Sequence, residues 1–429
     1  MSDVSNQIFR QLHDLDLKFG TLRDGDGQMV ELSHSSRCEL VTSPKLSVRK
    51  RAFQKFYRQF EAHKNAFSAT LGASVQRDVF DAKVRNFSSA LECALFKDNV
   101  PVGVYDNLIH SSRKHLSDVY RYYDLRKRKL RVSKLHAYDL SAPLVPKMQK
   151  RYTWNQAVKT IMDSLEPLGD KYCSILHEGL TTGRWCDRYP NQGKESGGFA
   201  SWSYDGPQYI LLNYQSTLGD VFALAHEAGH AMHWWHSARS QPFQYYICSI
   251  LANEVASIFN EQLLTRHLIR KAVSNEERAY LIDEQINRVI GTIISHAMFA
   301  EFEKIIHALV ENGEQLTVDA LRSTYRKLKE LYHGPGVTID KELELQCLRV
   351  PHLYQAFDLY KYALGLATAI ALSERITRGG SKELNDYLGF LKGGCSKWPL
   401  DLLRDAGVDL RKPQVVDTAL TQFGQLVSE

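Results

Sequence analysis

The stretch that decides the fold of this chain is "ALAHEAGHAMHWWH", residues 223–236. His226, Glu227 and His230 form the pattern H-E-x-x-H, which on a helix is the signature of a zinc peptidase. Residues i and i+4 share one helix face, so both imidazoles can point at the same ion. Glu227 stands one residue away from that face, where a carboxylate can serve as general base for a metal-activated water. A histidine pair packed into an ordinary helical core is the alternative interpretation.

A catalytic zinc usually has three protein ligands and one open position, so a third ligand is needed. His236 lies ten residues after His226, as in H-E-x-x-H-x-x-G-x-x-H, but His233 occupies the glycine position and the helix is expected to continue. Glu254 in "ILANEVASIFNEQLL" (250–264) is the second candidate. An unpaired carboxylate among apolar neighbours is costly, and a nearby cation removes that cost. The sequence therefore favours Glu254, with Glu261 as a partner that orients a histidine.

Composition and charge are those of an ordinary globular protein. The 429 residues are 44% hydrophobic and 24% charged, and the net charge of +5 is too small to indicate a nucleic-acid partner. No apolar run approaches the roughly 20 residues of a membrane span, and the first residues lack a signal-peptide pattern. Seven scattered cysteines form no C-x-x-C pair. We therefore expect a cytoplasmic protein without a membrane or nucleic-acid partner.

Helical periodicity dominates the chain and predicts a mainly α fold. The segments 47–71, 104–130 and 153–182 each read as a helix, and the basic residues 126–131 read as a solvated helix end. The texture changes in 183–214, which is rich in glycine and aromatic residues, and "QYILLNY" (208–214) is its clearest strand. We expect a small sheet there and long helices in most of the remaining chain.

Several blocks, in order, resemble the oligoendopeptidase F branch of the thimet-oligopeptidase-like zinc peptidases. They include "LAHEAGHAMH" followed by "ANEVASIFNE", "LHAYDLSAPLV", "YILLNYQSTLGDVFALAHEAGH", "PHLYQAFDLYKYALGLATAIAL" and "SKWPLDLLRDAGVDL". The resemblance implies a large helical catalytic domain with a thermolysin-like H-E-x-x-H…E site and a small sheet bordering a deep substrate channel. It also implies one Zn²⁺ per chain, with His226, His230 and Glu254 as ligands and Glu227 as base.

The same resemblance gives an expected domain organisation. Members of the family usually carry a helical region before the block that begins here near Asp14, so we expect 1–40 to be a short amino-terminal remnant of one lobe. The catalytic domain is expected over 41–425. Its parts are expected to be a small sheet in 183–214, zinc-binding helices in 218–264, and a substrate-binding loop and helix in 332–365.

Two further regions carry candidate substrate-binding residues. In the related peptidases, His and Tyr side chains from the region matching "RVPHLYQAFDLYKYALG" (349–365) contact substrate, which implies roles for His352 and Tyr360 in catalysis and for Tyr354 and Tyr362 in binding. An aromatic packing stripe is the alternative for the tyrosines. Gly197 and Gly198, before the predicted strand, could expose a backbone edge to which a peptide adds as a strand, or could merely serve a hairpin.

The sequence thus predicts a zinc-dependent endopeptidase that hydrolyses short unstructured peptides. A carboxypeptidase or dipeptidase on a related scaffold is one alternative. A non-catalytic, zinc-containing peptide-binding protein is the other.

Overall fold

The computed structural model describes residues 3–146, 148, 150–195 and 197–429. Helices make up most of this chain and strands are few and short, which confirms the mainly α prediction. The chain forms two compact units, each built from separate segments. Unit 1 comprises Met1–Pro146, Ile294–Tyr360 and Val427–Glu429, and unit 2 comprises Lys147–Ile293 and Lys361–Leu426.

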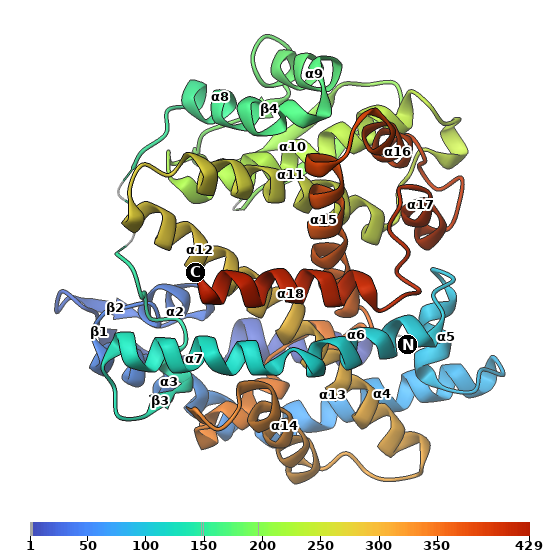
Figure 1. Ribbon diagram of the computed structural model, residues 1–429. Coiled ribbons are helices and arrows are strands. Elements are labelled where there is room, and N and C mark those ends of the chain that lie inside the picture. The colour runs from blue at the N-terminus through green and yellow to red at the C-terminus, as the bar shows by residue number, and fades with distance from the viewer. Residues whose placement is uncertain (1–2, 147, 149, 196) are drawn as a thin grey trace. The chain divides into compact units, whose positions relative to one another are not determined.

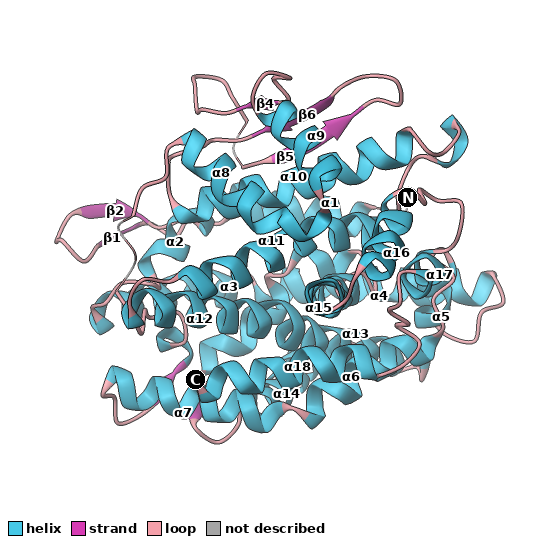
Figure 2. Cartoon of the chain, turned by 45° about the horizontal axis from the view of Figure 1, so that its top comes forward, coloured by secondary structure: helices cyan, strands magenta, loops and turns pink. Residues whose placement is uncertain are grey.

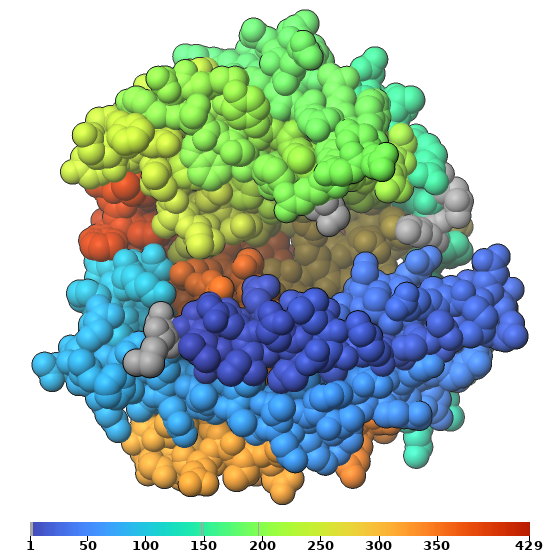
Figure 3. Space-filling model, turned by 180° about the vertical axis from the view of Figure 1, so that it is seen from behind, coloured from blue at the N-terminus to red at the C-terminus, as the bar shows by residue number. Residues whose placement is uncertain are grey.

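Unit 1 is a helical assembly in which the first helices of the chain pack against helices that follow residue 294 (Figures 1 and 3). Its helices are α1 (Val4–Arg10), the π-helix η1 (Gln11–Asp16), α2 (His34–Leu40), α3 (Leu46–Ala62), α4 (Lys64–Val84), α5 (Ala90–Phe96), α6 (Val102–Lys114), α7 (Leu116–Leu130), α13 (Ser295–Glu311) and α14 (Val318–His333), with the 3-10 turns η2 (Ala137–Asp139), η6 (Lys341–Leu348) and η7 (Pro351–Tyr354). Two strand pairs complete it: β1 (Thr21–Arg23) with β2 (Met29–Glu31), antiparallel, and β3 (Leu135–His136) with β7 (Val337–Thr338), parallel.

Unit 2 packs its helices beside the small sheet predicted for 183–214 (Figure 2). Its helices are α8 (Trp154–Leu165), α9 (Asp170–Leu180), α10 (Leu218–Ala238), α11 (Ile250–Lys271), α12 (Asn275–Val289), α16 (Ser381–Leu391) and α17 (Pro399–Asp405), together with nearly all of α15 (Tyr360–Arg378) and α18 (Gln414–Ser428). The shorter turns are η3 (Glu166–Leu168), η4 (Phe243–Tyr245) and, at the boundary of the units, the π-helix η5 (Ile290–Ile294). The sheet has the order β4-β6-β5, from Cys186–Asp187, Gln208–Leu211 and Phe199–Trp202. Strand β5 is therefore an edge, paired with β6 on one side only.

Each of the three predicted long helices is broken. The helix expected over 153–182 is interrupted between α8 and α9 by η3 and by Gly169, which has φ 82°. The helix expected over 47–71 ends at Ala62 and restarts at Lys64, because His63 leaves the helical conformation and its ring bonds to the Gln59 carbonyl at 2.8 Å. A similar break at His115 separates α6 from α7. The basic helix end was also predicted wrongly in part: Arg126 is 1% exposed and donates to the backbone oxygen of Asp139.

No helix in the described ranges combines the length and apolar character that crossing a bilayer requires.

Helices α10 and α11 run side by side and form the most extensive helix contact of unit 2 (Figure 1). Each has a defined start: Thr217 and Asp220 form a capping box on α10, and the Ser249 hydroxyl caps α11. The backbones meet at Gly229. A β-carbon there would lie 2.5 Å from Cα of Ser257 and 2.7 Å from the Ala256 carbonyl oxygen. Only glycine permits this approach, because the obstructing atoms are backbone.

We predict that Gly229→Ala separates α10 from α11 and lowers the free energy of unfolding by about 1–3 kcal/mol, the usual cost of overpacking. Chemical denaturation measures this effect. Gly219→Ala is the matched control on the same helix, because its new methyl group would meet only Thr217 Oγ1, at 3.6 Å. Equal stabilities for the two variants would show that the close approach is not needed.

Candidate metal centre

His226, His230 and Glu254 converge in unit 2. The two histidines lie one turn apart on α10, and Glu254 lies in the second turn of α11. One possible ligand atom from each residue lies within 4.8 Å of the others. The facing Nε2 atoms of His226 and His230 are 3.1 Å apart, and His226 Nε2 lies 3.9 Å from Glu254 Oε2.

These separations fit a metal ion. Two nitrogens at 2.0–2.1 Å from a tetrahedral zinc lie about 3.3 Å from each other. The two Nε2 atoms are close to that spacing, and a carboxylate oxygen completes a two-histidine, one-glutamate set of the kind found in thermolysin. The donor types and their spacing therefore suit Zn²⁺, with Glu254 as the third residue that the sequence favoured.

Burial sets the protonation of this cluster in the direction that metal binding requires. Desolvation lowers the pKa of His230 to about 3 and lowers that of His226, so both rings are neutral near pH 7 and can donate a lone pair. Desolvation also raises the pKa of Glu254. A carboxylate in such surroundings is stabilised as an anion by a neighbouring cation, which a bound metal would supply.

Glu261 orients His226, as the sequence indicated. Its Oε1 accepts a hydrogen bond from His226 Nδ1 at 2.6 Å, which leaves Nε2 as the lone-pair donor that faces His230. The other carboxylate oxygen of Glu261 forms an ion pair with Arg288 from α12. Arg288 also lies over the Phe222 ring, with its guanidinium carbon 5.2 Å from the centroid. This contact joins α12 to the helix that carries both histidines.

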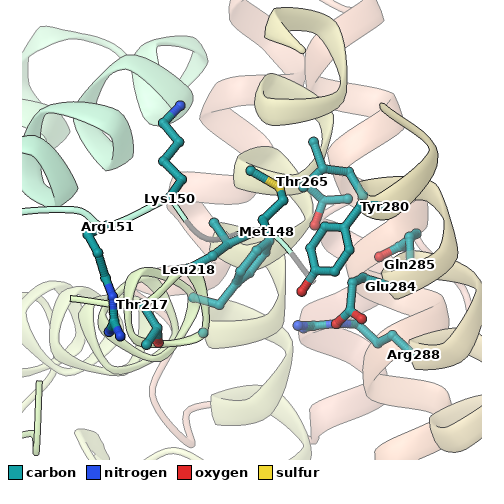
Figure 4. Close-up of a pocket in the computed structure, with 13 residues that line it drawn as sticks. Met148, Lys150, Arg151, Thr217, Leu218, Thr265, Tyr280, Glu284, Gln285 and Arg288 are labelled. Carbon is teal, nitrogen blue, oxygen red and sulfur yellow. The ribbon is translucent and has the colours of Figure 1, made fainter. Parts of the chain in front are cut away.

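Arg288 also lines a cavity of about 600 Å³ (Figure 4). Tyr280, Glu284 and Arg288 extend from α12 toward Leu218 at the start of α10. Arg288 was not predicted from the sequence, because it is 27 positions from Glu261 and no periodicity links the two residues. Arg288 thus both lines the cavity and pairs with the Glu261 carboxylate.

Glu227 points toward the small sheet. Burial raises the pKa of its carboxyl group, and the nearby Ala200 backbone amide of β5 has a smaller, lowering effect. A β-carbon at Gly198 would lie 3.8 Å from Glu227 Oε1 and 2.9 Å from a Leu212 methyl group. Gly197 has φ 91°, a conformation that favours glycine. The two glycines therefore bring the first residues of the edge strand close to the Glu227 carboxylate.

The other histidines of the opening stretch have different surroundings. His233 is buried and its Nε2 lies 3.2 Å from Cys248 Sγ. His236 lies further along the same helix, and its ring stacks on Tyr172, with ring centroids 6.0 Å apart. Neither ring belongs to the cluster of His226, His230 and Glu254.

The four candidates from 349–365 divide between the units. Tyr362 belongs to unit 2, on α15, where Gly365 packs near Cβ of Glu254. His352, Tyr354 and Tyr360 belong to unit 1. Tyr354 is 4% exposed and its hydroxyl lies 2.7 Å from Thr70 Oγ1, whereas Tyr360 is 1% exposed and its hydroxyl has no hydrogen-bond partner among the described residues.

Comparison with known proteins identifies the family of this chain. Residues 40–422, which include the whole cluster, match Peptidase family M3. The chain belongs to that family. It is 37% identical over 425 residues to Oligopeptidase PepF of Bacillus subtilis (99% of this chain, 63% of that protein) and 36% identical over 417 residues to an oligoendopeptidase F homolog of Borreliella burgdorferi (97% and 70%). This M3 chain thus spans less than two thirds of the Bacillus relative.

Solved structures give the same fold. The oligoendopeptidase-F of Enterococcus faecium matches with a TM-score of 0.82 at 31% identity, covering 100% of this chain and 71% of that one. A protein from Chlamydophila abortus matches with a TM-score of 0.92 at 35% identity, covering 100% and 72%. The resemblance to oligoendopeptidase F seen in the sequence is therefore confirmed.

We predict that Arg288→Met weakens zinc binding to this M3 chain about tenfold, because Glu261 loses the charge that holds it toward His226. Competition with a chromogenic chelator measures the affinity. Arg266→Met is the control, since Arg266 also lies on the α11 side of unit 2 but pairs with Glu374 rather than with Glu261. Equal affinities for the two variants would show that Arg288 does not support the metal ligand.

Proposed function

We propose that this chain is a zinc-dependent endopeptidase that hydrolyses peptide bonds in short unstructured oligopeptides. The observation that carries the proposal is the convergence of His226, His230 and Glu254 beside Glu227 in a member of Peptidase family M3. The names of its relatives, oligopeptidase and oligoendopeptidase F, support the choice of substrate class.

His226, His230 and Glu254 are proposed to hold one Zn²⁺. When bound there, the ion would polarise the scissile carbonyl and lower the pKa of a water molecule. Glu227 is the proposed general base and later the acid that passes the proton to the leaving amine. A raised pKa suits this exchange, because the carboxyl group must both take and release a proton near neutral pH.

Substrate binding is proposed along the free edge of β5. Among the described residues the strand pairs only with β6, so we propose that an extended peptide pairs with its other backbone edge. Gly197 and Gly198 lead into this edge, and a β-carbon at Gly198 would lie 3.8 Å from Glu227 Oε1. A peptide added there would lie beside the general base. Backbone pairing is independent of side-chain identity, which suits an enzyme of broad specificity.

The region 332–365 is proposed to supply the remaining substrate contacts within the catalytic domain of 41–425. His352 and Tyr360 are proposed to donate to the oxyanion that forms during hydrolysis, and Tyr362 to bind substrate. For Tyr360 this requires that its buried hydroxyl gain access to the peptide. Tyr354 is the weaker candidate for binding, because its hydroxyl is already bonded to Thr70.

A cytoplasmic location is proposed as well. All seven cysteines are free thiols, as expected for a reducing compartment.

We predict that Glu227→Gln keeps stoichiometric zinc but lowers kcat by a factor of about 10²–10⁴ or more, the usual contribution of a general base. The amide preserves size and packing but cannot accept the proton. Metal analysis and peptide cleavage measure the two properties. Glu276→Gln, at an exposed position of α12, is the matched control and should cleave at the normal rate. A fully active Glu227→Gln protein of verified mass would refute the assigned role.

A quenched fluorescent peptide with blocked ends tests the reaction class. Cleavage inside the capped peptide that stops on adding a chelator and returns with zinc is the expected result. A carboxypeptidase or dipeptidase would act only on peptides with free ends. Binding of the peptide by zinc-loaded protein without any cleavage would instead identify a non-catalytic peptide-binding protein.

A further inference from the structure

The segment that joins η7 to α15 contains an unusual backbone conformation at Phe357. This residue has φ 57° and is 2% exposed. Bulky side chains rarely adopt the left-handed region, and such residues persist only when the surrounding structure holds them there. The sequence places no glycine or asparagine at this turn. Something in unit 1 must therefore stabilise the conformation.

Glu303 makes the contact that stabilises it. This residue lies on α13, is 0% exposed, and accepts the Phe357 amide N–H on its Oε1 at 2.9 Å. Its Oε2 has no hydrogen-bond partner among the described residues. The Glu303 carboxyl group therefore accepts the backbone N–H of Phe357 in a part of the segment that forms no helix or strand.

Aromatic packing fixes the same turn. The His307 ring lies 4.4 Å from the Phe357 ring, and its Nδ1 donates to the Glu303 carbonyl oxygen at 2.8 Å. The Tyr105 ring lies 5.8 Å from Phe357 and 5.4 Å from Tyr360. The packing that surrounds Phe357 thus extends to Tyr360, one of the two proposed oxyanion donors.

The other end of the segment is held by α4. Thr70 Oγ1 lies 2.7 Å from the Tyr354 hydroxyl. Tyr354, two residues after His352, is therefore held in place as well. Residues 355–359, between η7 and α15, form no helix or strand, and these buried contacts hold them at both ends.

We propose that Glu303 is a positioning residue: its carboxyl group accepts the Phe357 amide N–H, holds Phe357 in the left-handed conformation and so places His352 and Tyr360 for catalysis. The catalytic part of this inference rests on the proposed peptidase function. The structural part, that Glu303 shapes the segment 351–360, stands on the contacts of unit 1 alone.

The surroundings of Glu303 favour its protonated form. Burial raises its pKa well above the ordinary value. The hydrogen bond from the Phe357 amide acts in the opposite direction, and the nearby carboxylates of Asp358 and Asp78 raise the pKa further. Tyr105 also faces it, and His307 is neighbour to both Glu303 and Asp78. A protonated glutamic acid still presents its carbonyl oxygen to the Phe357 amide. Glutamine at this position would present an equivalent oxygen, whereas methionine would not.

Hydrogen–deuterium exchange over 351–360 tests the structural part. Glu303→Met should speed exchange of this segment at least tenfold, and Glu303→Gln should leave it within threefold of the unmodified protein. Glu301→Met is the matched control on α13, because Glu301 is also buried but pairs with Arg113 and the Tyr332 hydroxyl. Slow exchange in Glu303→Met, or equally fast exchange in Glu301→Met, would overturn the proposal.

Peptide cleavage tests the catalytic part. Glu303→Met should lose at least tenfold in kcat at full zinc stoichiometry, and Glu303→Gln should restore it. If Glu303→Met loosens the segment but keeps kcat, the positioning role is overturned while the peptidase assignment stands. If the unmodified protein cleaves no peptide, the proposed function fails, and the exchange measurement still decides whether Glu303 holds the segment.

The pH dependence of stability tests the protonation state. The folded protein keeps the Glu303 proton, whereas the unfolded chain releases it above the ordinary glutamate pKa. Folding with Glu303 therefore becomes less favourable as pH rises, and Glu303→Gln escapes this loss. The melting temperature of Glu303→Gln minus that of the unmodified protein should increase steadily from pH 5 to pH 8. A difference that stays constant or decreases over this range would show that Glu303 is ionised.

Discussion

The contact between α10 and α11 at Gly229 is the constraint on which the candidate site depends. H-E-x-x-H supplies two proposed ligands from one helix face, but the third proposed ligand comes from another helix and must reach within a bond length of the same point. Carboxylate side chains are short, so the helix axes must lie close together. Gly229, inside the motif itself, permits this by leaving the Ser257 backbone room to approach. The position between Glu227 and His230 thus has a packing role as strict as the chemical roles of its neighbours.

Close packing also buries several ionisable groups side by side, and a bound cation would stabilise their charged carboxylates. The imidazoles of His226 and His230 are neutral, and burial raises the pKa values of the neighbouring Glu227 and Glu254 carboxyl groups. Without a cation, such a site favours protonated acids and weak ligands. Glu261 differs from these two carboxyl groups, because its negative charge is paired with the guanidinium group of Arg288. The arrangement gives His226 an anionic hydrogen-bond acceptor without adding net charge to the metal site, a common design around zinc-bound histidines.

The sequence predicts local features well and long-range ones poorly. The motif fixed His226, Glu227 and His230 on one helix, and an apolar setting singled out Glu254, because both arguments need only helical spacing. Strand β6 fell within the predicted "QYILLNY" for the same reason. The break at His63 depends on a single side-chain-to-carbonyl bond, and the Arg288–Glu261 pair joins helices whose packing no periodicity reveals. The left-handed turn at Phe357 could not be predicted from the sequence either, because phenylalanine rarely adopts this conformation. Only the contacts of Phe357 in the folded chain explain the turn.

Glu254 and Glu303 show why burial alone does not identify a metal ligand. Both are glutamates on helices with apolar neighbours, and for both the pKa is raised mainly by desolvation. The argument that an expensive buried carboxylate indicates a cation would therefore select Glu303 as readily as Glu254. What separates them is the nearest partner. Glu254 faces an imidazole nitrogen, which has a lone pair and repels another acceptor unless an ion or proton lies between them. Glu303 faces a backbone N–H, which a neutral acid satisfies without any ion. The partner, rather than the cost of burial, distinguishes the proposed metal ligand Glu254 from the proposed positioning residue Glu303.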